Sequence, residues 1–118
     1  MRILFTGASS FTGYWFVREL TGTRPSLPVV ATAATRVCAP NACGGCANCA
    51  RLRFDCAFGN DDFLALTKTP SDVLCNHGAE VGDYRSPDFD PYRAAAANLH
   101  RLPEVLRALK DRGAGVWC

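Results

Sequence analysis

Short apolar runs alternate along this chain with longer segments whose apolar residues recur at helical spacing. The runs lie at 3–5, 27–32 and 73–75, and the last carries no charge, as expected of a strand covered on both faces. The helical segments lie at about 11–21, 60–69 and 90–109. Strands that alternate with helices predict a parallel sheet with right-handed crossovers. The pattern therefore predicts one α/β domain over residues 1–118.

Capping and turn residues indicate where these elements begin and end. Asn60 or Asp61 can cap the second helix, and Pro70 stops it. Asp90 followed by Pro91 is a strong start for a third helix, which is expected to continue to residue 109 with a kink or a lost hydrogen bond at residue 103, a proline. Its apolar stripe consists of Leu99, Leu102, Val105, Leu106 and Leu109. Further strands are expected at 57–59, as the tail of a third strand, and at 116–118.

The segment 6–13, Thr-Gly-Ala-Ser-Ser-Phe-Thr-Gly, joins the first apolar run to the first helix. Gly7 permits a sharp turn off the strand, and Gly13 permits the helix to pack closely on it. Ser10 takes the place of a middle glycine, and its hydroxyl is expected to donate to a phosphate oxygen. Backbone N–H groups and the dipole at a helix start favour an anion such as a pyrophosphate. The segment predicts a nucleotide site, and the alternative is a Gly/Ser turn without a ligand.

A second polar turn is expected at the same edge of the sheet. Residues 76–80, Asn-His-Gly-Ala-Glu, follow the run at 73–75 as residues 7–13 follow the first run. Ligands of parallel α/β sheets lie beyond the carboxyl ends of the strands. Two polar turns at this edge therefore strengthen the prediction of a nucleotide site.

Composition narrows the class of protein. Its 118 residues, 48% hydrophobic and 20% charged, are ordinary for one globular domain. The net charge of +2 comes from scattered Lys and Arg, which disfavours a nucleic-acid partner. No apolar run approaches the ~20 residues that span a bilayer, and the short apolar start does not resemble a signal peptide. A cytoplasmic protein without a membrane or nucleic-acid partner is therefore expected.

Five of the seven cysteines fall in the segment 36–56, which is poor in aliphatic residues. An odd count without a secretory signal disfavours a disulfide framework. Cys43, Cys46 and Cys49 have the C-x2-C-x2-C spacing of metal knuckles, with Cys38 or Cys56 as a candidate fourth ligand. No histidine lies nearby, and no second C-x2-C pair follows. We therefore expect an irregular Cys-rich loop without metal, and a small metal-binding protein is the alternative.

These motifs together resemble the extended short-chain dehydrogenases/reductases, the NAD-dependent epimerase/dehydratase family that includes UDP-glucose 4-epimerase-like proteins. Residues 6–13 are similar to its Thr-Gly-x-x-Gly-x-x-Gly turn, and 72–79 to its fourth strand and His-x-Ala-Ala turn. Residues 58–61 are similar to a Gly-Asp turn that contacts adenine, and 98–109 to the helix that supports the active site. The resemblance covers most of the chain except 36–56. It implies a truncated Rossmann-like, doubly wound parallel sheet of about four strands and the start of a fifth.

The resemblance also implies NAD or NADP as the cofactor. The residues expected to bind it are Gly7, Ser9, Ser10, Phe11, Thr12, Gly13, Arg36, Asn60, Asp61, His77, Gly78, Ala79 and Asn98. A ribose-binding acid is usual after the second strand, yet 31–37 contains none, and Arg36 would instead meet a 2′-phosphate. The alternatives are a solvated Arg36 and a His77 that is only hydrogen-bonded at a strand end. Trp15 and Phe16 are expected to pack in the core.

The sequence departs from the family at the catalytic residues. The Tyr-x-x-x-Lys pair is missing, because none of Tyr14, Tyr84 and Tyr92 is followed by a lysine four residues later. Proton transfer in this chemistry needs a tyrosine whose pKa a lysine lowers. We expect the NAD(P)-binding portion of an oxidoreductase acting on nucleotide sugars, inactive alone and without the substrate-binding half. The alternative is a regulatory module without catalysis that forms a homodimer through 98–109.

Overall fold

The structure, a computed structural model, describes residues 1–33, 52–53, 55–79 and 82–117. Five parallel strands form one sheet with the order β3-β2-β1-β4-β5. The strands are β1 (Ile3–Thr6), β2 (Val29–Thr32), β3 (Leu52–Arg53), β4 (Val73–Asn76) and β5 (Gly115–Trp117). The helices are α1 (Phe11–Thr23), α2 (Asp61–Thr67), α3 (Pro91–Asn98) and α4 (Leu102–Lys110). This strand order confirms the predicted doubly wound α/β fold.

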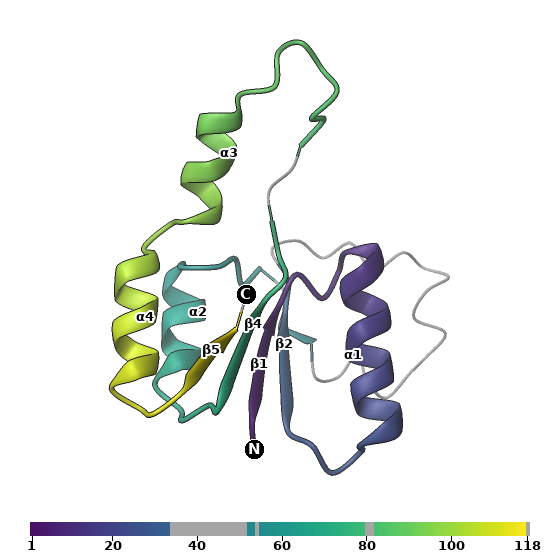
Figure 1. The fold of residues 1–118 in the computed structure, drawn as a ribbon, viewed down its shortest axis with the longest axis vertical. Helices are drawn as coiled ribbons and strands as arrows, with labels where there is room; N and C mark the ends of the chain where they lie inside the picture. Colours follow the sequence, from purple (N-terminus) through teal and green to yellow (C-terminus); the bar gives the residue numbers. More distant parts are fainter. Residues whose placement is uncertain (34–51, 54, 80–81, 118) are drawn as a thin grey trace.

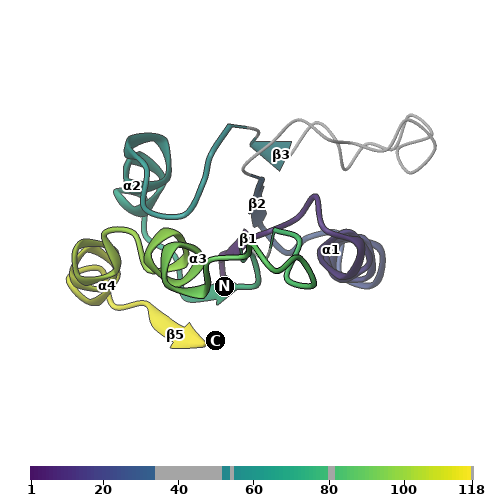
Figure 2. The ribbon, with the colours of Figure 1, turned by 90° about the horizontal axis from the view of Figure 1, so that it is seen from above.

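Helices cover both faces of the sheet, with α1 on one side and α2 and α4 on the other (Figures 1 and 2). The central strand β1 is buried along its whole length, as expected of a parallel strand covered on both faces. Successive side chains of β1 enter different cores. Ile3 and Phe5 pack in a cluster with Val17 of α1, whereas Leu4 packs in a second cluster with Phe63 of α2.

The third helix of the sequence analysis is two helices in the structure, so the prediction of one kinked helix was wrong. The α3 helix ends at Asn98, and Arg101 adopts a left-handed backbone conformation with φ 53° before α4 begins. Proline lacks an N–H, and its ring clashes with the carbonyl four residues earlier. The break places Pro103 in the first turn of α4, where proline is tolerated. The α3 helix, beyond the carboxyl edge of the sheet, has no buried residue (Figure 1).

Two further expectations are corrected. The third strand lies at Leu52–Arg53, whereas 57–59 forms a turn in which the Asn60 N–H donates to the Ala57 carbonyl at 3.1 Å. Trp15 and Phe16 are 49% and 57% exposed, not core residues. The reason for their exposure is that α1 faces the sheet through positions four residues apart, namely Gly13, Val17 and Thr21.

None of the helices in the described part of the chain has the length and apolar character needed to cross a membrane.

Candidate functional site

The turn between β1 and α1 is held by the hydroxyl of Ser10, which caps the helix. Ser10 Oγ accepts from the Gly13 N–H at 3.0 Å and donates to the Gly7 carbonyl at 2.8 Å. The hydroxyl proton is therefore directed into the turn, not outward as expected for a phosphate donor. Ser10 is the N-cap residue, one of the residue types favoured there because its oxygen satisfies a helix-terminal N–H.

Backbone N–H groups remain available at the start of α1. In the described part of the chain, the N–H groups of Ser9 and Thr12 have no hydrogen-bond acceptor, whereas that of Ala8 donates to the Thr32 carbonyl at 3.0 Å. The first turn of α1 contains no acidic residue. Unpaired N–H groups at a helix start carry partial positive charge, so this end of α1 favours an anion.

The turns that follow β1 and β4 are packed against each other through glycine. Gly7 has φ +72°, and a Cβ on it would lie 2.4 Å from the Cα of Gly78. A Cβ on Gly13 would lie 2.1 Å from the Gly7 carbonyl oxygen. Thr6 Oγ1 donates to Asn76 Oδ1 at 2.8 Å and accepts from the Gly78 N–H at 2.9 Å. The predicted meeting of the two turns at one edge is therefore present in the structure.

His77 is hydrogen-bonded at the end of β4, the alternative that the sequence left open. Its Nε2 lies 2.7 Å from Thr12 Oγ1 in the first turn of α1. The imidazole packs beside Phe5 and Phe16, with ring centroids 5.7 Å and 5.9 Å away. The side chain thus joins β4 to the start of α1, 65 residues away in the sequence.

A cavity of about 170 Å³ opens at the same edge, on the face covered by α2. Gly7, Gly78, Ala79 and Asn98 line it, which brings together predicted residues from three parts of the chain. None of its lining side chains carries a charge. Its volume is below the roughly 300 Å³ at which typical pockets for small molecules begin. The cavity is therefore uncharged, and it is small compared with the length of a whole dinucleotide.

The predicted list of cofactor-binding residues omits several residues that line this cavity, two of which (Thr6 and Phe58) lie in predicted binding segments. They are Thr6, Thr32, Cys56, Ala57, Phe58 and Ala97. Thr6 and Thr32 are buried hydroxyl residues at the ends of neighbouring strands. A polar residue that ends an otherwise apolar strand is a usable signal, because the carboxyl ends of parallel strands meet at the ligand-binding edge.

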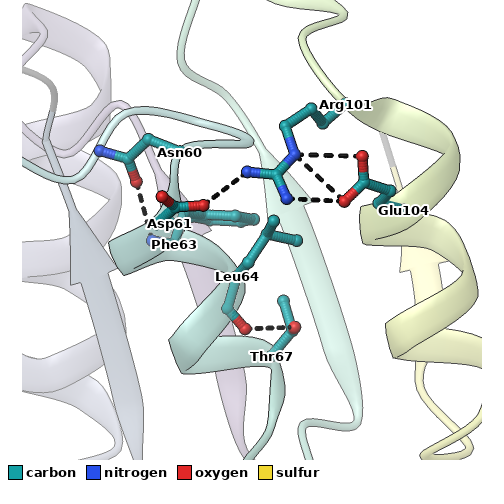
Figure 3. A network of polar contacts seen from close by, with 7 residues as sticks. All are labelled: Asn60, Asp61, Phe63, Leu64, Thr67, Arg101 and Glu104. Carbon is teal, nitrogen blue, oxygen red and sulfur yellow. Dashed lines mark hydrogen bonds and ion pairs between the residues drawn. The ribbon is translucent and has the colours of Figure 1, made fainter.

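Asn60 and Asp61 have structural roles beside this cavity, and their predicted contact with a cofactor stays a prediction. Asn60 Oδ1 caps α2 by accepting from the Phe63 N–H at 2.8 Å (Figure 3). Asp61 Oδ1 accepts from the Arg101 guanidinium at 2.6 Å, and Glu104 Oε2 accepts from the same group at 2.7 Å (Figure 3). Hydrogen bonding to Arg101 lowers the pKa of Glu104 below its usual value. This network ties the corner between α3 and α4 to the start of α2.

Most of the Cys-rich segment lies outside the described residues, including Arg36, Cys38, Cys43, Cys46 and Cys49. The predictions on these residues therefore stay predictions. Cys56 is described and buried. Burial, with a smaller contribution from the charge of Asp62, raises the pKa of its thiol to about 11. Metals bind the thiolate, so this environment disfavours Cys56 as a ligand. Among the described residues, no group of three or more His, Cys, Asp or Glu is placed to hold a metal ion.

Comparisons with known proteins bear on the fold. No protein-family model matches the chain, and no curated protein sequence matches it. Among solved structures, the crystal structure of L-threonine dehydrogenase from Phytophthora infestans matches with a TM-score of 0.63 and 21% sequence identity. The match covers 98% of this chain and 34% of that chain, so this chain spans about a third of that protein's length. At this identity the likeness supports the fold alone, which is Rossmann-like.

Proposed function

We propose that the chain binds a nicotinamide dinucleotide, NAD or NADP, as part of an oxidoreductase. The observation that carries the proposal is the joining of the two turns at one sheet edge, where Gly7 contacts Gly78 and the N–H groups of Ser9 and Thr12 lack acceptors among the described residues. A doubly charged pyrophosphate suits these N–H groups because backbone amides and the dipole of α1 both favour negative charge. The likeness to a solved structure named as a dehydrogenase supports a nucleotide-binding oxidoreductase.

The residues at the sheet edge divide between the two chemical parts of such a ligand. The start of α1 would hold the pyrophosphate, and the uncharged cavity beside Thr32 and Asn98 would hold the adenosine ring system. A side chain at position 7 or 13 would clash with neighbouring backbone atoms, so glycine at both positions lets this edge pack closely. The nicotinamide supplies hydride transfer when bound. This chain's own contribution is to bind and orient the dinucleotide.

The substrate class is a finer part of the proposal. The resemblance to the epimerase/dehydratase family favours a nucleotide sugar, whereas the solved neighbour is named for L-threonine. These 118 residues lack a tyrosine followed four residues later by lysine. We therefore expect them to bind the cofactor without turning over a substrate alone, because in the family that the chain resembles this pair transfers the proton that accompanies hydride exchange.

Calorimetric titration of the chain with NAD+ and NADP+ tests the proposal, and the Ser9→Asp variant tests whether the start of α1 holds the pyrophosphate. Ser9 precedes the cap of α1. A carboxylate here is expected to stabilise the helix through its dipole and yet to repel a pyrophosphate. We expect heat of binding with at least one dinucleotide. In Ser9→Asp we expect the affinity to be about tenfold weaker, because one unfavourable charge interaction costs about 1.4 kcal/mol.

Ser26→Asp is the matched control for Ser9→Asp. Ser26 is an exposed residue of the turn between α1 and β2, at the opposite edge of the sheet. The same charge change there is expected to leave the affinity unaltered. Absence of heat with both dinucleotides, from a sample whose circular dichroism shows it folded, would contradict the proposed function.

We also propose a second copy of the chain as a partner. Large apolar side chains are exposed around the corner of α3 and α4, where Leu99 is 57% and Leu106 38% exposed. We take these side chains as parts of one contact surface, since exposed apolar patches favour an interface. We expect sedimentation equilibrium to detect a homodimer that weakens when Leu99 is replaced by Glu. A native chain that sediments as a monomer at high concentration would rule this partner out.

A further inference from the structure

We propose that His77 is a positioning residue that makes the affinity of the phosphate turn depend on pH, acting through the hydroxyl of Thr12. The inference rests on the proposed dinucleotide binding and adds its regulation. Thr12 is the second residue of α1, and its own N–H has no acceptor in the described part of the chain. Its Oγ1 lies 2.7 Å from the Nε2 of His77. One side chain therefore stands both at the anion-binding end of the helix and in contact with a titratable ring.

The direction of this hydrogen bond depends on which nitrogen of the imidazole carries a proton, and we assign the proton of the neutral ring to Nδ1. When Nε2 carries no proton, it accepts from the Thr12 hydroxyl, whose single proton is then unavailable to another acceptor. When the ring is protonated, Nε2–H donates to Thr12 Oγ1, and the hydroxyl proton is free to turn toward a phosphate oxygen. Protonation also adds a positive charge beside the site. Both changes strengthen the binding of an anion.

The side chains that pack against the His77 ring do not exchange protons with it. Phe5 of β1 and Phe16 of α1 pack beside the imidazole, and neither can share its proton. Cys75 packs on the same cluster as Phe5, and burial raises the pKa of its thiol, so it stays neutral. A ring held by two aromatic side chains can switch the direction of its hydrogen bond without leaving its position.

The charged Arg18 side chain of α1 contacts an aromatic ring other than His77. The Arg18 guanidinium lies 4.9 Å from the centre of the Trp15 ring. The first turn of α1 carries no acidic residue that would pair with a protonated His77. Among the described residues, the structure gives no contact between His77 and a charged side chain. An incoming pyrophosphate would therefore be the natural counter-ion of the protonated ring.

Calorimetric titration with NAD+ at about pH 8 and about pH 5.5 tests the inference, because histidine changes its charge between these values. The pyrophosphate of NAD+ does not titrate in this range, so a pH dependence reports on the protein. We expect affinity to be about tenfold higher at the lower pH, as for a hydrogen bond strengthened by charge. Circular dichroism at both pH values checks that the chain stays folded.

Replacement of each of the two histidines separates His77 from general effects of pH. In His77→Gln the amide does not titrate, so equal affinities at both pH values are expected. His100 is exposed and lies at the corner between α3 and α4, away from α1. His100→Gln is therefore expected to keep the full pH dependence. A His77→Gln variant that kept it would overturn the inference.

Variants of Thr12 test whether the histidine acts through the hydroxyl. Thr12→Ser keeps the hydroxyl and is expected to keep the tenfold gain, whereas Thr12→Val is expected to lose most of it. If Thr12→Val kept the full tenfold gain in affinity at low pH, the charge of His77 would act without the Thr12 hydroxyl, and the inferred role of Thr12 would be wrong. If the unsubstituted chain bound NAD+ equally well at both pH values, this inference would be overturned and the proposed dinucleotide binding would stand. A folded chain that binds no NAD+ at either pH would overturn both.

Discussion

Gly7→Ala is expected to lower the free energy of unfolding by about 3 kcal/mol, a large share of the roughly 5–15 kcal/mol that stabilises a domain. Gly7 has φ +72°, a conformation that costs an L-residue about 1–2 kcal/mol. The new Cβ would also lie 2.4 Å from the Cα of Gly78, and relief of such overpacking costs a further 1–3 kcal/mol, approximately. Urea denaturation followed by circular dichroism measures the change.

Two other glycines serve as controls that separate these costs. Gly113 has φ +75° with nothing within 4 Å of its ideal Cβ, so Gly113→Ala should show the conformational cost alone, about 1–2 kcal/mol. Gly22 lies within α1 and also has open space, so Gly22→Ala should stabilise the chain by about 0.5–1 kcal/mol. Equal effects of Gly7→Ala and Gly113→Ala would show that the β1 and β4 turns are not in close contact.

Leu109→Ala is expected to cost about 3 kcal/mol, in the range of buried leucine truncations. Leu109 is 1% exposed and packs on the face of the sheet that holds Leu4, Phe63 and Leu74. Truncation removes buried apolar surface and leaves a cavity that the surrounding strands and helices cannot close. Urea denaturation of dilute protein measures this loss.

Leu106→Ala provides the matched comparison, because it removes the same atoms from the same helix three residues earlier. Leu106 is 38% exposed, so its truncation is expected to cost less than about 1 kcal/mol. Similar losses for the two variants would mean that α4 does not face the sheet through Leu109.

The elements that sequence predicted well are those with a strong local cause. Asn60 and Asp90 each cap a helix in the structure, as predicted from their side chains. The parallel direction of the strands follows from the alternation of strand and helix. The left-handed break at Arg101 was not anticipated, although Pro103 supplied its cause, because a proline inside a helical pattern is compatible with a kink or with a new start.

Predictions that depend on tertiary contacts were weaker. The exposure of Trp15 and Phe16 depends on which side of α1 meets the sheet, and their size alone suggested burial. The two turns of the candidate site could be placed at one edge, because each follows a parallel strand. The contact of His77 with Thr12 joins residues 65 apart and requires the register of β1 with β4, which no local pattern specifies.

The central place of β1 has a consequence for how the chain acquires its structure. Ile3 is paired with Val29 on one side and with Val73 on the other. The second pairing closes a loop of about 70 residues, and such distant contacts slow folding because chain entropy is lost before they form. During synthesis, β1 therefore has only one paired edge until β4, about 70 residues later, has also been made.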